Sequence, residues 1–227
     1  MKIIAHRCGT DRFPELTIDS AKYSLDAGAY LVEMDTHFTS DGVVVISHDS
    51  DCKFLFGDER KIKDMTSEEF LSLKYKENNE YSASTLEAFL KAGIRNILFH
   101  IKVGGERLNT ILQLCRKYNI ENDVVFGVGS LDDVKIVKDF NSNIKVLAFM
   151  YNFDKIREYA DFGADYIRLW EHWLSEENIE KVLSTGKKLW IMSGNYETCG
   201  FTDKSNIPVW EKIGADAVLV NNVCDFI

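Results

Sequence analysis

Two carboxylates in the first third of the chain have the spacing of metal ligands. Glu33 and Asp35 are two residues apart in a strand-like run, so both side chains project to the same face of it. Two carboxylates on one face repel each other, and a divalent cation between them would neutralise the pair. An isolated Glu-x-Asp more often faces water or a basic neighbour, so the prediction of a metal site depends on which other residues lie nearby.

Two histidines are predicted to approach these carboxylates. His6 follows the first strand-like run of the chain. Asp41-Gly42, between two strand-like runs, predicts a β-hairpin, and a turn centred on that peptide bond places His48 roughly opposite Asp35. Histidine titrates near neutral pH, so a pair of histidines at one place suits acid and base roles.

A third strand-like run adds a histidine and a lysine at the same spacing. His100 lies within the run and Lys102 follows it, two residues later. Because active sites of parallel barrels lie at the carboxyl ends of the strands, we expect these side chains to lie near Glu33 and Asp35.

The elements that must position these residues alternate regularly between strand-like and helical patterns. Strand-like runs are Lys2–Ala5, Tyr30–Asp35, Val43–Ser47, Asn96–Ile101, Asp123–Gly127, Ile144–Phe149, Asp165–Leu169, Lys188–Met192 and Asp216–Val220. Helical patterns are Thr17–Ala27, Ser67–Leu73, Ser84–Ala92, Glu106–Tyr118, Leu131–Phe140, Asp154–Phe162, Ser175–Ser184 and Ile207–Ile213. The hairpin removes one strand from the parallel set, and eight remain. This α/β pattern predicts a (β/α)8 TIM barrel, with an open doubly wound sheet as the alternative.

Composition and charge limit the classes of protein that the chain can belong to. Its 227 residues suit one domain spanning 1–227, with a polar insertion at about 50–83 after the hairpin. A net charge of −9 argues against nonspecific nucleic-acid binding, which needs clustered basic residues. The five cysteines form no CxxC pair, and no apolar run reaches membrane-spanning length. We therefore expect a small-molecule substrate, no membrane span and a cytoplasmic location.

At these residues the sequence resembles the glycerophosphodiester phosphodiesterase family. The family's ordered motifs correspond here to His6-Arg7-Cys8-Gly9, Pro14-Glu15-Leu16-Thr17, Gly28-Ala29, Glu33-Met34-Asp35, Thr39-Ser40-Asp41-Gly42, His48-Asp49, Ser84-Thr85-Leu86-Glu87 and His100-Ile101-Lys102. The resemblance is dense over residues 1–102 and weaker beyond them.

The resemblance implies a TIM barrel that hydrolyses glycerophosphodiesters to glycerol 3-phosphate and an alcohol with a divalent metal ion. The attacking group, the glycerol 2-hydroxyl or a water, stays open. The implied roles are general base and general acid for His6 and His48, phosphate binding for Arg7 and Lys102, metal ligation for Glu33 and Asp35, and support of the metal shell or of Arg7 for Glu15.

The departures from the family's motifs suggest a divergent member. His100 stands where the family has a third metal-binding carboxylate, and an imidazole there favours Mn²⁺ or Zn²⁺ over Mg²⁺ or Ca²⁺, or else weakens metal binding. Cys8 interrupts His-Arg-Gly, Leu16 replaces an asparagine, and Asn221 and Asn222 stand where an acidic residue is usual. Two other readings remain: a related barrel enzyme that makes a cyclic phosphate, and a binding domain without turnover.

Residues later in the chain are weaker candidates for the site. The pair Gly104-Gly105 precedes a helical pattern and could bind phosphate at its N-terminus. Glu171 and His172 follow a late strand and are candidates for a substrate or metal contact. Aromatic residues that follow or lie in the late strands could line a pocket for the alcohol; they are Trp170, Trp173, Trp190 and Tyr196.

Overall fold

Eight parallel strands form a closed ring in the computed structural model, which describes residues 1–227. In order round the ring they are β1 (Lys2–Ala5), β2 (Leu31–Phe38), β4 (Ile97–Ile101), β5 (Val124–Val128), β6 (Lys145–Ala148), β7 (Tyr166–Trp170), β8 (Lys188–Met192) and β9 (Ala215–Val220). Pairing of β1 with both β2 and β9 closes the sheet. A ninth strand, β3 (Val44–Ile46), pairs antiparallel with β2 outside the ring. The predicted (β/α)8 barrel is therefore confirmed.

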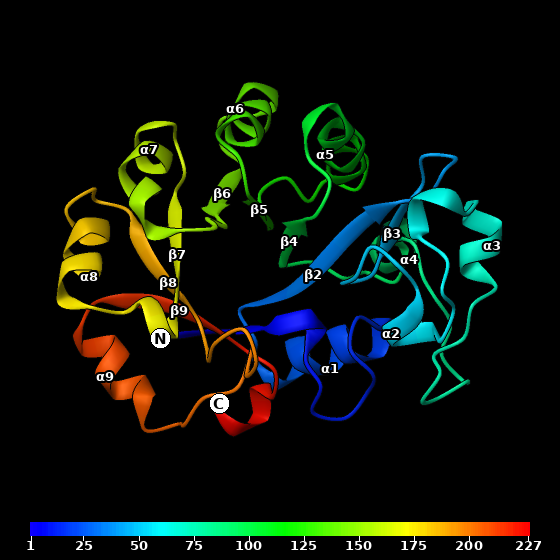
Figure 1. Ribbon diagram of the computed structural model, residues 1–227, viewed down its shortest axis with the longest axis horizontal. Coiled ribbons are helices and arrows are strands. Elements are labelled where there is room, and N and C mark those ends of the chain that lie inside the picture. Colours follow the sequence, from blue (N-terminus) through cyan, green and yellow to red (C-terminus); the bar gives the residue numbers. More distant parts are fainter.

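Helices surround the strands and connect one to the next (Figure 1). They are α1 (Ile18–Ala27), α2 (Lys53–Phe56), α3 (Ser67–Leu71), α4 (Leu86–Lys91), α5 (Leu108–Lys117), α6 (Leu131–Phe140), α7 (Ile156–Asp161), α8 (Glu176–Leu183) and α9 (Asn206–Lys212). Short 3₁₀ turns are η1 (His6–Cys8), η2 (Ile62–Asp64), η3 (Gly105–Arg107), η4 (Phe153–Lys155), η5 (Glu171–Trp173) and η6 (Val223–Asp225). Side-chain N-caps start five of the helices, at Thr17, Thr66, Thr85, Ser130 and Ser175.

The predicted hairpin is present, but its register differs from the prediction by one residue. The Ser47 N–H donates to the carbonyl of Asp35 at 3.2 Å, so Ser47 lies opposite Asp35 and His48 does not. The turn is centred on Asp41 because Gly42 adopts a φ of +82°, the left-handed conformation that completes a three-residue hairpin loop.

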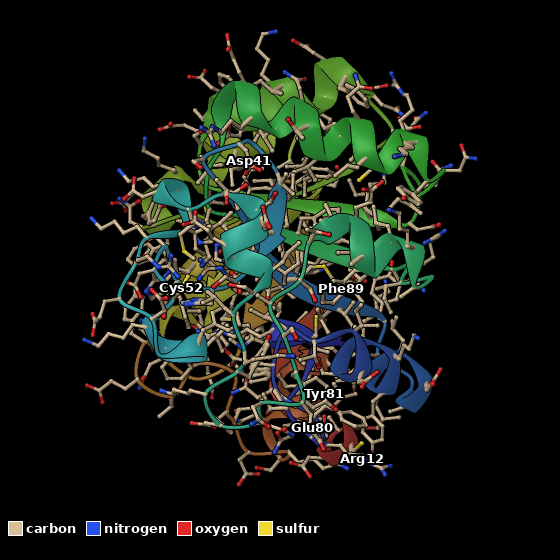
Figure 2. All side chains as sticks on the ribbon, turned by 90° about the vertical axis from the view of Figure 1, so that its right-hand side faces the viewer. Arg12, Asp41, Cys52, Glu80, Tyr81 and Phe89 are labelled. Carbon is tan, nitrogen blue, oxygen red and sulfur yellow. The ribbon has the colours of Figure 1, made fainter.

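Residues 50–83 lie between the hairpin and α4 and contain α2, which was not predicted, and α3. The Asp41 carboxylate at the hairpin tip accepts hydrogen bonds from the amide and hydroxyl of Ser67, at 2.9 and 2.7 Å. Figure 2 faces this side of the molecule and shows Asp41 beside α3. Tyr75 donates its hydroxyl to the carbonyl of Glu15, which joins the segment to the loop after β1. The segment therefore packs on the barrel at both ends.

Alternate residues of the barrel strands fill the inside of the ring with apolar side chains. We call this layer the floor: it consists of Ile4, Leu31, Leu98, Val125, Leu147, Tyr166, Trp190 and Leu219. The intervening strand residues pack outward against the helices in a larger core. Because the floor is filled, open space within the ring can lie only above it, toward the carboxyl ends of the strands.

Two aspartates stabilise the opposite, amino-terminal end of the barrel. Asp165 accepts hydrogen bonds from Lys138 Nζ at 2.7 Å and the Val146 amide at 2.9 Å. Asp216 accepts from Trp190 Nε1 at 3.1 Å. Trp190 is therefore part of the floor, and the prediction that it lines an alcohol pocket is wrong.

No helix in the structure is both long enough and apolar enough to span a membrane.

Candidate functional site

The site residues form the layer directly above the floor. In a strand, the residue two positions after an inward-pointing residue also points inward. Two positions beyond the floor, the strands and their continuations carry His6, Glu33, His100, Gly127, Phe149, Arg168, Met192 and Asn221. Asp35 follows Glu33 at the same spacing. The period of two thus brings polar residues from distant parts of the sequence to one end of the barrel.

His6 is buried and its imidazole has a defined orientation. Its Nδ1 lies 2.7 Å from Asn221 Oδ1, while Asn221 Nδ2 donates to the carbonyl of Cys199 at 2.9 Å. The second bond assigns the amide oxygen of Asn221 to His6, so Nδ1 carries the proton and Nε2, which lies 3.8 Å from Cys199 Sγ, is the nitrogen that can accept one. Burial lowers the pKa of His6, against the opposing effect of Glu33, and this favours the neutral imidazole.

Arg7 connects the first strand to the metal-ligand candidates through its backbone and its side chain. Its backbone adopts a positive φ of 49°, and its amide donates to Glu33 Oε2 at 2.7 Å. Its Nη1 donates to Glu15 Oε1 at 3.1 Å, so Glu15 contacts Arg7.

Two residues that depart from the family's motifs, Cys8 and Leu16, also have positive φ values, of 67° and 57°. Glycine and asparagine adopt this conformation more readily, so the two replacements carry backbone strain.

Glu33, Asp35 and His100 form a group whose ligand atoms all lie within 4.8 Å of one another. His100 Nδ1 is 2.9 Å from Asp35 Oδ1 and 3.5 Å from Glu33 Oε1. Lys102 Nζ is 3.0 Å from Asp35 Oδ1, and despite burial its charge helps to hold the pKa of Asp35 well below the usual range. Glu33 Oε1 and both carboxylate oxygens of Asp35 are buried without a partner of hydrogen-bond geometry. Unpartnered buried carboxylate oxygens fit a site that binds a cation.

His48 faces the same space from the end of the hairpin. Its Nδ1 lies 2.7 Å from Asp49 Oδ1, which leaves Nε2 for chemistry. His37 Nε2 lies 3.2 Å from the backbone carbonyl of His48 and helps to fix the segment. Burial lowers the pKa of His48, partly offset by the charge of Asp35. Despite the shifted register, His48 therefore reaches the site as expected.

One cavity of about 340 Å³ brings these groups together. Its polar lining consists of His6, Arg7, Glu33, His48, His100, Lys102 and Arg168. The volume lies within the range of small-molecule sites. All the residues predicted for the site line this cavity except Asp35, which lies beneath its surface, and Glu15, which contacts it through Arg7.

Some late candidates from the sequence lie elsewhere. Trp170 and Tyr196 line the cavity, whereas Trp173 packs against Phe153 outside it. Glu171 accepts hydrogen bonds from the Gly194 amide, at 2.6 Å, from the Thr202 hydroxyl and from the side-chain amide of Asn206 at the start of α9, so it stabilises the connection between β8 and α9.

The glycine pair before α5 is not a phosphate site. Gly105 donates its amide to Asp133 Oδ1 at 2.7 Å. A side chain at Gly104 would meet the same carboxylate, since a Cβ there would lie 2.3 Å from it. An anion is already provided by the chain, so a phosphate would have to compete with Asp133.

Sequence reasoning missed several residues that contact the site. Asn221 was noted only as a departure from an acidic position, and neither Asp49 nor His37 was assigned a role. Arg168 was not singled out at all. For Arg168 a signal existed, because an arginine inside an otherwise apolar strand of a closed barrel must point somewhere polar.

Known proteins resemble the chain in both sequence and fold. The model of the Glycerophosphoryl diester phosphodiesterase family matches residues 6–206. A glycerophosphodiester phosphodiesterase of Caldanaerobacter subterraneus is 30% identical over 166 residues, which are 69% of this chain and 60% of that protein. A lysophospholipase D of Homo sapiens is 28% identical over 64% of this chain and 51% of that protein. The chain thus spans only about half to three fifths of the length of these relatives.

Solved structures support the fold over the whole chain. A glycerophosphodiester phosphodiesterase from Thermotoga maritima has a TM-score of 0.74 at 22% identity and covers 99% of this chain and 96% of its own. A phosphodiesterase from Oleispira antarctica, in complex with the product sn-glycerol-3-phosphate, has a TM-score of 0.80 at 16% identity. The match covers 100% of this chain and 95% of the Oleispira chain. At sequence identities of 22% and 16%, these structural matches establish the barrel fold alone.

Proposed function

The chain belongs to the glycerophosphoryl diester phosphodiesterase family, and on that premise we propose that it hydrolyses glycerophosphodiesters to sn-glycerol 3-phosphate and an alcohol. The observation that carries the proposal is the convergence of His6 and His48 on one cavity with Glu33 and His100. The relative from Caldanaerobacter bears the name of this activity, and the Oleispira structure holds its product.

We assign the metal ligands to Glu33, Asp35 and His100. All three present a ligand atom to one point. Apart from His100, the only charged contact of the carboxylate oxygens turned to that point is Lys102 Nζ, 3.0 Å from Asp35 Oδ1. Arg7 supports this assignment, because its amide holds Glu33 Oε2 and directs Oε1 toward the group. A divalent ion bound there would supply positive charge for the non-bridging oxygens of the phosphodiester.

In this proposal Arg7 and Lys102, which both line the cavity, bind the phosphate. Arg7 Nε is buried without a hydrogen-bond partner, so it retains a donor for a ligand. Glu15 holds the guanidinium in place from behind through Nη1. Fixed donors aimed at the oxygens where charge increases stabilise the transition state, because they need no reorganisation during reaction.

The two histidines move the protons. His6 accepts the proton of the attacking hydroxyl or water at Nε2, and Asn221 stabilises its ring through Nδ1. His48 donates a proton from Nε2 to the leaving alkoxide, while Asp49 orients it. Burial lowers the pKa of His48, and the negative phosphodiester would raise it again on binding. Exchange with solvent after product release restores both protonation states.

The test is an assay of chelator-treated protein against several glycerophosphodiesters, with Mg²⁺, Ca²⁺, Mn²⁺ and Zn²⁺ added back. We expect release of sn-glycerol 3-phosphate only with added ion, and its loss in His6→Ala and His48→Ala. His172→Ala is the matched control, because His172 does not line the cavity. Full activity in both site variants would contradict the mechanism. A cyclic glycerol phosphate that accumulates as the final product in the phosphorus NMR spectrum would contradict the open product; one that appears only transiently, before water opens it, would assign the attack to the glycerol 2-hydroxyl.

A further inference from the structure

Arg168 on β7 is a buried charge without an anionic partner. The residue is 5% exposed, and its Nε and Nη1 have no hydrogen-bond partner. Its Nη2 donates to the carbonyl of Met150 at 3.3 Å, and it forms no salt bridge. The arginine nevertheless lines the same cavity as the two histidines.

Aromatic rings surround the guanidinium in place of carboxylates. Its Cζ lies 4.9 Å from the ring centroid of Trp170, 5.1 Å from that of Phe149 and 5.5 Å from that of Trp173. Cation–π contacts offset only part of the cost of removing an ion from water. Burial lowers the pKa of Arg168 to about 10, so the side chain keeps its charge at neutral pH. Two unused donors and an uncompensated charge make this end of the cavity a receptor for an anion.

This receptor lies across the barrel from the proposed metal ligands. In the ring order β7 is the fourth strand from β2 in either direction, so Arg168 faces the strand of Glu33. Phe149 lies between the two ends: its ring stacks on His100 at 4.2 Å and contacts Arg168 on its other flank. A Cβ on Gly127 would come within 2.3 Å of this ring, so glycine there makes room for it. Arg168 is thus positioned to contact a group attached to the reacting phosphate, and not the phosphate itself.

We propose that Arg168 binds a second anionic group, a carboxylate or phosphate on the alcohol portion of the substrate. The proposal rests on the phosphodiesterase function above and specifies its substrate class. An aromatic lining would otherwise suit the quaternary ammonium of choline. Here the guanidinium already lies over the cavity-lining rings of Phe149 and Trp170, and its charge repels a second cation. Diesters whose alcohol ends only in a cation should therefore be the poorer substrates.

Glycerophosphoserine and glycerophosphoethanolamine test the proposal, because the two diesters differ only by a carboxylate. We expect the wild-type protein to have a higher kcat/KM for the serine diester. Arg168→Met should reduce that value about ten- to a hundredfold, the range for losing hydrogen bonds to a charged group, and leave the ethanolamine value within a fewfold of wild type. Arg168→Lys, which keeps the charge, should retain part of the preference. The matched control is Arg116→Met, since Arg116 lies on the exposed surface of α5.

Binding is measured separately by calorimetry in the His48→Ala background, so the comparison stands even if the protein hydrolyses neither diester. There the serine diester should bind more tightly than the ethanolamine diester, and Arg168→Met should remove the difference. Equal losses for both diesters would place Arg168 on the reacting phosphate and overturn the proposal. No preference in the wild-type protein would also overturn it. A large fall in melting temperature of Arg168→Met, with its preference for the serine diester unchanged, would assign the arginine a merely structural role and overturn the proposal.

Discussion

Divalent ions should stabilise the folded protein through the group formed by Glu33, Asp35 and His100. The three ligand atoms converge within 4.8 Å on rigid strands, whereas the unfolded chain holds them far apart. Binding to the folded state alone adds RT ln(1 + [L]/Kd), which is about 2.7 kcal/mol at an ion concentration of 100 Kd. For a domain of this size, that free energy corresponds to a rise in melting temperature of roughly 5–10 °C.

The perturbation is Asp35→Asn, which keeps the shape of the side chain and removes one charge from the group. Asp35 is fully buried, its Oδ2 has no hydrogen-bond partner and its Oδ1 contacts only His100 and Lys102, so an ion is expected to depend on it strongly. In the ion-free protein the substitution relieves repulsion from Glu33 but loses the contact with Lys102, and these effects oppose each other. The variant should therefore melt near the ion-free wild type and gain little from added ions.

The assay is thermal unfolding of chelator-treated protein, followed by circular dichroism, with each of Mg²⁺, Ca²⁺, Mn²⁺ and Zn²⁺ titrated in. Asp139→Asn is the control, because Asp139 only forms an exposed ion pair on α6. If no ion raises the melting temperature of the wild-type protein, the group does not bind metal. An equal rise in Asp35→Asn would place the bound ion elsewhere.

Three further predictions test other parts of the structure. Asn221→Asp should raise the pKa of His6, since a carboxylate at Nδ1 stabilises the imidazolium, so the acid limb of the kcat/KM–pH profile should move to higher pH. Asp165→Asn should lower the free energy of unfolding at pH 7 by about 1–3 kcal/mol. Two lysines and an amide outweigh burial and lower the pKa of Asp165 when folded. The difference should therefore begin to shrink as pH falls below about 3.9, the pKa of an unfolded aspartate, and vanish as pH falls through the lower folded pKa, as urea unfolding at a series of pH values from 7 downward would measure. Gly127→Ala should displace Phe149 and raise KM, and an unchanged KM would contradict the assigned role of that ring.

The identity of the ion is the point at which this chain departs most from its family's motifs. In the proposed metal site, His100 would supply a nitrogen where the family's motif has a carboxylate, and its Nδ1 lies 3.5 Å from Glu33 Oε1 and 2.9 Å from Asp35 Oδ1. Imidazole suits Mn²⁺ or Zn²⁺ better than Mg²⁺ or Ca²⁺. The ion titrations should accordingly give the larger stabilisation with the transition metals, and His100→Glu should reverse that order.

Much of the fold followed from local patterns in the sequence. Alternating strand-like and helical runs predicted the barrel, because each strand needs one covered face and each helix covers one. The i, i+2 spacing of Glu33 and Asp35 placed both on one face of β2, as the structure shows. Motifs read from the sequence also located His6, His48 and His100 at one cavity, since parallel strands bring their carboxyl ends together.

Other features depended on contacts between distant segments. The hairpin register changed by one residue because Gly42 adopts a left-handed conformation, which no spacing rule specified. Trp170 lines the cavity while Trp190 fills the floor, although both are tryptophans in late strands. Their positions along the strands relative to the closed ring decide between these two environments.

The amino-acid sequence by itself determined which residue types could perform the chemistry and the strand faces from which they project. Only the tertiary structure decided what each of them meets. It placed Asn221 at Nδ1 of His6 and left Arg168 without any carboxylate. The physical reason is that the face on which a strand residue lies is a local property of its spacing along the strand. The partner of a buried side chain, in contrast, lies on another strand, which only closure of the barrel brings opposite to it.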